Sequence, residues 1–192
     1  AMYTRPDLSM DFYELDPDVV DIARNYFWYL KLAPGLVNVH VGDARVSLAG
    51  TDSVYDILVI DAFGGDSIPF HLINKDVVKM YRQHLSASGG ILFHIPNRYF
   101  NLEAVLAHIA HDLGAFAAVK EAVQDGITMK TYWAVITWDQ EKFSRLVVQD
   151  NWRPMNTEDY KPLRTWDDDY STALPVLKFD EIYQSLKHFK LY

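Results

Sequence analysis

Alternating strand-like and helix-like segments between residues 11 and 139 constrain the fold of this chain more than any other feature. Three short apolar runs, "MDFYEL", "LVNVHVGD" and "YDILVID", read as strands, and segments with helical spacing lie among them. Strands that alternate with helices along the chain are typical of α/β domains with a parallel sheet. The sequence therefore predicts an α/β fold whose sheet is mostly parallel.

The first helix is expected to begin at Asp16-Pro17, because aspartate is a favourable N-cap and proline suits the first helical position. Its buried face is predicted from apolar residues at helical spacing, namely Val19, Ile22, Ala23, Tyr26 and Leu30. A second amphipathic helix is predicted for residues 72–85, and the loop "SASGG" is expected to end it.

The rest of the chain is expected to complete the same domain. "ILFHI" predicts a fourth strand, and residues 101–113 predict a helix that Gly114 ends. "AFAAVKEAV" and "TYWAVITW" predict a closing antiparallel pair. Residues 152–177 are expected to wrap the surface before a last helix at 179–189. We expect residues 1–140 to form a Rossmann-like nucleoside-binding part, and residues 141–192 to add the C-terminal helices and tail of that domain.

Composition argues against several classes of function. The 192 residues include no cysteine, which excludes disulfides, thiolate metal sites and a cysteine nucleophile. The formal charge of −8 argues against nucleic acid as a partner, because a nucleic-acid surface needs a basic stripe. No histidine pair combines metal-ligand spacing with a supporting acid, so no metal is expected. No apolar run is long enough to span a membrane, and the segment is expected to be a soluble cytoplasmic domain without membrane contact.

Acids stand at the ends of three successive predicted strands: Glu14, Asp43 and Asp61. Ligands of open parallel sheets bind outside the carboxyl ends of the strands, so all three side chains are expected to face one crevice. An acid after the second strand of such folds accepts the ribose hydroxyls. The alternative for each acid is a cap on the following helix or turn, which is the role expected of Asp16. Together the three acids favour a nucleoside site.

Several motifs resemble those of the spermidine synthase family of aminopropyltransferases. They are "YELDPDVVDIAR", "VGDARVSL", "YDILVIDAFGGDSIPFHL" and "SGGILFHIPNRYFNLEAVL", and they cover, with the tail "WDDDYSTALPVL", roughly residues 1–177. The match is closer to the spermidine-synthase-like domains that bacteria fuse behind a membrane-transporter-like region. The resemblance implies a methyltransferase-like Rossmann fold that binds decarboxylated S-adenosylmethionine or S-adenosylmethionine.

The resemblance also has implications for the chain as a whole. The family's first strand and glycine-rich loop would lie just upstream of Ala1, so the predicted fold lacks both. A longer native chain would tether the domain to the inner membrane. Related enzymes are commonly dimers or tetramers, which makes a homodimer an open expectation.

Site roles follow from the resemblance by position. Glu14, beside Asp16, would hold the ribose hydroxyls, and Asp43 would hold the adenine amino group with Ala44 beside the ring. Asp61 falls where the family keeps its catalytic aspartate, which takes a proton from an amine such as putrescine. The resemblance thus implies a transferase with Asp61 as general base.

The loop after Asp61 departs from the family pattern. Gly64 stands where aminopropyltransferases carry a second aspartate, and Asp66 follows two residues later, either as an ammonium anchor or as a cap. His71 either lines the pocket entrance or is exposed, and Arg98 either clamps a substrate carboxylate or phosphate or pairs with nearby acids. His94, at the mouth of a buried strand, either faces the same crevice or is a core histidine with a backbone partner, and the second is the expectation.

Three functions remain open at this point. The first is aminopropyl transfer to an amine, and the second is methyl transfer from S-adenosylmethionine. The third is a ligand-sensing domain that retains the fold without catalysis, which Gly64 at the position of the second acid favours.

Overall fold

The computed structural model describes residues 7–33, 35–62, 69–95, 99–123 and 130–188. The chain divides into two compact units, Ala1–Ser53 and Val54–Tyr192. The expected division at residue 140 stays a prediction. Within the ranges given above, no helix is long and apolar enough to cross a membrane.

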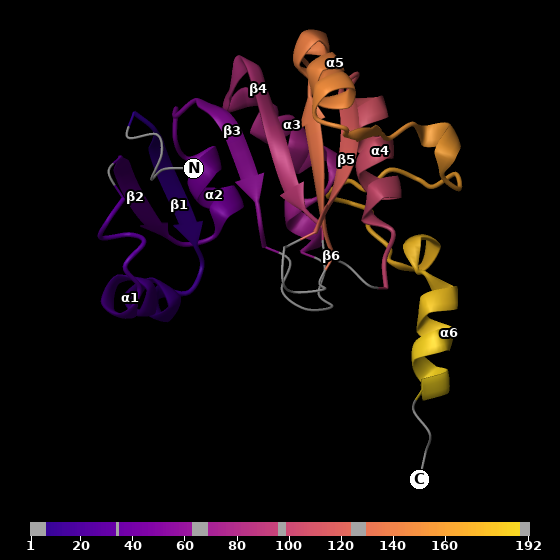
Figure 1. Cartoon of the computed structure of the whole chain (residues 1–192), viewed down its shortest axis with the longest axis horizontal. Coiled ribbons are helices and arrows are strands. Elements are labelled where there is room, and N and C mark those ends of the chain that lie inside the picture. Colours follow the sequence, from indigo (N-terminus) through magenta and orange to yellow (C-terminus); the bar gives the residue numbers. More distant parts are fainter. Residues whose placement is uncertain (1–6, 34, 63–68, 96–98, 124–129, 189–192) are drawn as a thin grey trace. The chain divides into compact units, whose positions relative to one another are not determined.

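The first unit is a small parallel βαβ arrangement (Figure 1). Strands β1 (Ser9–Glu14) and β2 (Leu36–Val41) pair in parallel, with Glu14 opposite Val41 at their carboxyl ends. Helix α1 (Pro17–Tyr26) connects them, and α2 (Ala44–Ala49) follows β2. The sequence predicts both strands and the start of α1, but α2 was not among the expected elements.

The predicted buried face of α1 is wrong. Val19, Ile22 and Tyr26 are 46%, 49% and 77% exposed, and Val20 is the residue of α1 that is buried. Leu30, also assigned to that face, lies beyond the end of the helix. Helical spacing identified an apolar stripe correctly, but a sheet of two strands offers too little surface within this unit to cover it.

The second unit contains a five-stranded sheet in the order β3-β4-β6-β5-β7. Strands β3 (Tyr55–Ile60) and β4 (Leu85–His94) are parallel, whereas β6 (Lys130–Thr137) is antiparallel to both β4 and β5 (Phe116–Val123). The short β7 (Arg153–Pro154) extends the sheet beyond β5. The expected closing antiparallel pair is confirmed.

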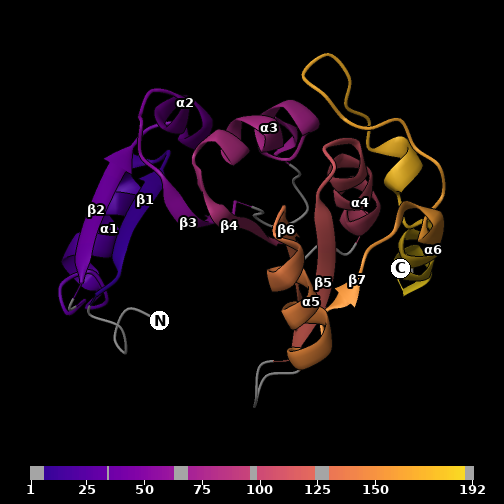
Figure 2. The same ribbon diagram turned by 90° about the horizontal axis from the view of Figure 1, so that it is seen from above.

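Helices cover both faces of this sheet. Figure 2 shows α3 (Lys75–Gln83) and α4 (Leu102–Asp112) on one face and α5 (Gln140–Gln149) on the other. Alternate residues of the strands face α3 and α4, so Ile91 and Phe93 of β4 and Ile136 of β6 are fully buried. Val105 and Ile109 of α4 pack there as predicted. This layer forms the core of the unit.

Two predicted boundaries in this unit are wrong. Helix α3 begins at Lys75, because the buried Asn74 caps it by accepting the N–H of Val77 at 2.9 Å. The stretch "SASGG" is the first half of β4 instead of a loop that ends the helix. A Cβ on Gly89 would lie 3.2 Å from the carbonyl oxygen of Asp56, so glycine permits β3 and β4 to approach at the bulge between them.

The C-terminal segment wraps the second unit as expected. It contains the short turns η3 (Thr157–Asp159) and η4 (Leu174–Val176), and α6 (Phe179–His188) follows. Trp166 is 1% exposed and its ring lies 4.9 Å from that of Phe70 in η2 (Phe70–Leu72). Asn74 donates to Asp168, and the N–H of Asp168 donates to Asp76. The aspartates after Trp166 therefore serve packing at the start of α3.

Candidate functional site

Two of the predicted site acids lie at neighbouring strand ends in the first unit. Glu14 ends β1, and Asp43 follows β2 after Gly42, whose N–H donates to the Glu14 carbonyl at 2.8 Å. Gly42 has a φ of +143°, a conformation that strongly favours glycine, and it turns the chain from the strand into α2. Parallel pairing thus places both acids at one edge of this small sheet, as the sequence predicts.

Both turns use carboxylates to hold the backbone. Oε1 of Glu14 accepts the N–H of Asp16 at 3.0 Å, and Asp16 accepts the N–H of Asp18 at 2.9 Å as the N-cap of α1. Asp43 caps α2 by accepting the N–H of Val46 at 3.0 Å, and Ala44 is the first residue of that helix. The capping role expected of Asp16 is confirmed, and Asp43 has the same kind of role. Each carboxylate has two oxygens and can accept several hydrogen bonds, so a capping role does not by itself exclude contact with a ligand.

The third acid is held by a histidine in the second unit. Asp61 directly follows β3, where the preceding Ile60 pairs with Phe93, so Asp61 falls opposite His94 at the end of β4. Oδ1 of Asp61 lies 2.6 Å from Nδ1 of His94, and Nε2 of the same ring is hydrogen-bonded to the hydroxyl of Thr131. We call these three residues the Asp61–His94–Thr131 row.

The row crosses the carboxyl ends of β3 and β4 and reaches the start of β6. Trp133 is paired with His94 in the β4–β6 register, and the two rings stack with centroids 4.5 Å apart. The Asp61 side chain is 59% exposed, whereas that of His94 is 23% exposed. A carboxylate is therefore presented to solvent while the imidazole behind it is held on three sides.

The expectation that His94 is a core histidine with a backbone partner is wrong, because both ring nitrogens contact side chains. Sequence reasoning missed Thr131 and Trp133. The alternation in "TYWAVITW" places them on one face of a strand, but it does not say which strand lies beside them.

The other predicted site residues are placed only in part. Asp66, with Gly64 and Gly65, and Arg98 lie outside the residues that the structure describes. His71 lies in η2 and is exposed. Glu14 and Asp43 belong to one unit and Asp61 to the other, so a single crevice that contains all three acids stays a prediction.

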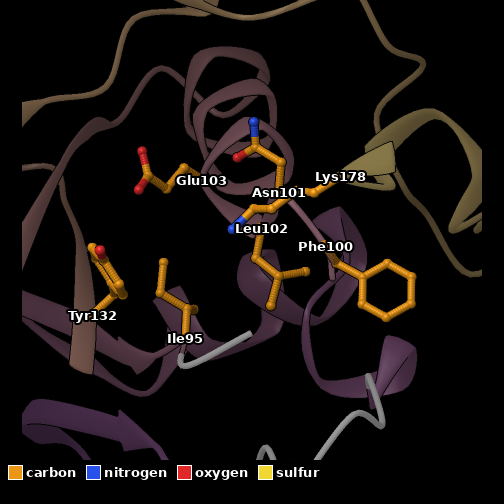
Figure 3. Close-up of a pocket in the computed structure, with 7 residues that line it drawn as sticks. All are labelled: Ile95, Phe100, Asn101, Leu102, Glu103, Tyr132 and Lys178. Carbon is orange, nitrogen blue, oxygen red and sulfur yellow. The ribbon is translucent and has the colours of Figure 1, made fainter. Parts of the chain in front are cut away.

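A pocket of about 150 Å³ lies at the start of α4 (Figure 3). Its lining residue Tyr132 precedes Trp133, the partner of His94, on β6, so by strand alternation it points to the face opposite His94. The pocket is lined by Ile95, Phe100, Asn101, Leu102, Glu103, Tyr132 and Lys178. Its one carboxylate already accepts from Arg153 and from the Tyr160 hydroxyl, the latter at 3.0 Å. Since this charge is compensated and a lysine lines the same pocket, the pocket offers little attraction to a cationic substrate.

The Glu103–Arg153–Tyr160 cluster joins α4 to β7 and the following turn. Burial raises the pKa of Tyr160, and the neighbouring Glu103 raises it further, while Arg153 opposes both effects. The hydrogen bond with Tyr160 and the charge of Glu103 raise the pKa of Arg153. The cluster is thus a structural ion pair at the edge of the sheet, and it takes no part in the row on the other face.

Comparison with known proteins identifies relatives of two kinds. The chain is 40% identical over 87 residues to a polyamine aminopropyltransferase of Vibrio vulnificus, covering 44% of this chain and 28% of the relative. It is 30% identical over 84 residues to a probable polyamine aminopropyl transferase of Bifidobacterium longum, covering 44% and 18%. It is 23% identical over 185 residues to an eEF1A lysine and N-terminal methyltransferase of Xenopus laevis, covering 88% and 25%. The chain thus matches between 18% and 28% of the length of these relatives.

Solved structures share the fold. A probable spermidine synthase from Corynebacterium glutamicum superposes with a TM-score of 0.64 at 14% identity, covering 88% of this chain and 67% of that one. Human methyltransferase-like protein 13, solved in complex with SAH, gives 0.57 at 19% identity, covering 84% and 75%. No model of a known protein family matches the chain. The methyltransferase-like Rossmann fold and the similarity to the spermidine synthase family are therefore confirmed, while a fused transporter region stays an expectation.

Proposed function

We propose that this chain carries an aminopropyltransferase-type site, which transfers the aminopropyl group of decarboxylated S-adenosylmethionine to an amine such as putrescine. The observation that carries the proposal is the exposed Asp61 carboxylate, fixed by His94 at the end of β3. The similarity to a polyamine aminopropyltransferase supports the same reaction class. In this reading Asp61 is the catalytic residue.

The chemistry asks for one proton acceptor beside a cationic substrate. The ammonium form of the substrate gives a proton to the Asp61 carboxylate, and the lone pair freed on nitrogen then forms a bond to the carbon next to the sulfonium. The carbon–sulfur bond breaks and its electron pair returns to sulfur, which leaves neutral methylthioadenosine. The positive charge passes from sulfur to the nitrogen of the product, and the ionised carboxylate is favourable beside the ammonium substrate until it takes the proton.

The first unit supplies contacts for the nucleoside in this proposal. Glu14 holds the ribose hydroxyls, and Asp43 accepts the adenine amino group with Ala44 beside the ring. Both acids lie at neighbouring carboxyl ends of parallel strands, which supports a ligand at that edge. Asp16 supports the turn between β1 and α1 through its cap on Asp18.

Three further residues are proposed for the amine end of the substrate. Asp66 would anchor a remote ammonium group, and His71 would line the entrance. Arg98 would be placed near the same end and would favour a substrate that also carries a carboxylate. A homodimer likewise remains part of the proposal.

The test is turnover by Asp61→Asn in the natural full-length protein. Loss of a general base is expected to lower kcat/KM for putrescine by roughly 10²- to 10⁴-fold. Asp56→Asn is the matched control, because it makes the same change on the same strand at a carboxylate bonded to Ser86. A wild-type rate in Asp61→Asn would show that Asp61 is not the general base.

Methyl transfer from S-adenosylmethionine is the second candidate. The match to a methyltransferase that extends over 88% of this chain favours it. Mass spectrometry of the product separates the two reactions, since a methyl and an aminopropyl group add different masses. A product that carries only a methyl group would replace the first proposal with the second.

A ligand-sensing domain is the third candidate, favoured by Gly64 where the family keeps an aspartate. Calorimetry with methylthioadenosine separates it from both enzymes. Binding of the nucleoside together with no turnover of any amine by the wild-type protein would establish the sensor.

A further inference from the structure

The Asp61–His94–Thr131 row has a fixed direction of hydrogen bonding at its first contact. An ionised carboxylate only accepts hydrogen bonds, so the 2.6 Å contact requires a proton on Nδ1 of His94. That proton is donated to Oδ1 of Asp61. The carboxylate is consequently held by one oxygen, and more than half of its side-chain surface remains open to solvent.

The second contact is compatible with a neutral ring, because a hydroxyl can either donate or accept. With Nδ1 protonated, Nε2 of a neutral imidazole is an acceptor, and the hydroxyl of Thr131 can donate to it. A charged ring would instead donate from both nitrogens, and it would add a positive charge beside Asp61. Because the proposed substrates are a sulfonium and an ammonium, a neutral ring suits the site better.

Packing fixes the plane of the ring. Trp133 stacks on His94 with an interplanar angle of 22°, and it comes from the strand directly paired with β4. The stack aims Nδ1 at Asp61 and Nε2 at Thr131, which is two residues before Trp133 on the same face of β6. Three neighbouring strands therefore hold one carboxylate through a single imidazole.

We propose that His94 is the positioning residue of Asp61. In its neutral form, with the proton on Nδ1, it holds Oδ1 so that Oδ2 meets the amine, while the hydroxyl of Thr131 donates to Nε2. This inference rests on the proposed function, because it assigns a task to the same carboxylate. It goes further by assigning tasks to His94 and to Thr131, which lies outside the quoted motifs, and by naming the state of the ring between Asp61 and Thr131.

The first experiment reads the ring directly and needs no turnover. Long-range ¹H–¹⁵N correlation spectra distinguish an imidazole with its proton on Nδ1 from one with its proton on Nε2 and from the charged ring. The Nδ1-protonated form is expected in the wild-type protein and in Thr131→Ser, which keeps the hydroxyl. Thr131→Val, which removes it, is expected to keep the proton on Nδ1, because Asp61 still accepts it, and to change the ¹⁵N shift of Nε2, which loses its hydrogen bond. An Nε2-protonated or charged ring in the wild type at the assay pH would overturn the inference.

The second experiment measures the effect on Asp61. His94→Leu removes the donor and is expected to lower kcat roughly 10- to 100-fold with KM within a few-fold, because a misplaced group affects the transition state most. His94→Asn, whose side-chain amide can donate near the position of Nδ1, is expected to recover part of the loss. Wild-type kcat in His94→Leu would overturn the inference. A wild-type protein without turnover would instead reject the proposed function, and the spectra would still decide the state of the row.

Discussion

Both units carry an acid at the end of a strand, but they differ greatly in how many apolar residues are buried around their strands. Among the residues described in the unit Ala1–Ser53, the buried apolar ones are Val20 and Leu48, and the exposed face of α1 carries Ile22 and Tyr26. In the unit Val54–Tyr192 a sheet covered by helices on both faces buries Ile91, Phe93 and many others completely. An acid ends a strand in both. The comparison shows that an acid at a strand end can serve as a local helix cap in a unit with few buried residues. In a well-packed unit, the same kind of acid can belong to a row of hydrogen-bonded side chains.

The largest difference in unfolding free energy between the two units is expected when a buried tryptophan and an exposed tryptophan are each replaced by alanine. Trp166→Ala in the second unit should lower the free energy of unfolding by about 3–5 kcal/mol, because it leaves a cavity beside Phe70. Trp28→Ala in the first unit, where the ring is 74% exposed, should change it by less than about 0.5 kcal/mol. Urea unfolding followed by circular dichroism measures both. Equal losses would show that the aromatic surface after α1 is covered in solution.

Two isoleucines on helices make the same comparison without aromatic rings. Ile109→Ala on α4, where the side chain is fully buried, should cost about 2–5 kcal/mol. Ile22→Ala on α1 should be close to neutral, because the side chain is 49% exposed and alanine is the better helix former. Thermal unfolding of the two variants is the measurement. A cost at Ile22 as large as that at Ile109 would mean that another surface packs on α1.

One helix cap from each unit allows the two units to be compared through single hydrogen bonds. Asn74→Ala should cost about 1–3 kcal/mol, because Asn74 is buried and also donates to Asp168. Asp43→Ala should cost about 1 kcal/mol at the exposed end of α2. Hydrogen exchange of the capped amides, Val77 and Val46, reports each loss locally. Faster exchange at Val46 than at Val77 in the wild-type protein would confirm that the first unit is the weaker support.

The smallest effect is expected at alkaline pH. The pKa of Tyr160 is raised in the folded protein, so the folded state keeps a proton that the unfolded state releases above a pH of about 10. The stability associated with this group is complete below that pH and is lost as the pH rises through the folded pKa. Tyr160→Phe should therefore reduce the loss of melting temperature between pH 8 and pH 11. Tyr26→Phe, at a ring that is 77% exposed, is the control and should follow the wild type.

Local signals in the sequence predicted much of the fold. Asp16-Pro17 marked the start of α1, Gly114 with its φ of +62° marked the end of α4, and the two runs predicted as an antiparallel pair became β5 and β6. The errors have a common cause. The stretch "SASGG" and the face of α1 were assigned from residue type and spacing, whereas the outcome depended on whether a partner strand or a covering surface was present.

The candidate site shows the same division. The sequence alone determined that acids follow the strands, because a polar residue after a short apolar run is visible in the order of residues. Only the tertiary structure decided that His94 holds Asp61 and that Thr131 contacts His94. Asp61 and His94 are 33 positions apart, His94 and Thr131 are 37 positions apart, and strand pairing brings them together. The direction of a hydrogen bond, the plane of a ring and the exposure of a side chain depend on the residues packed around it. Those residues can be far away in the sequence, so the order of residues alone does not reveal them.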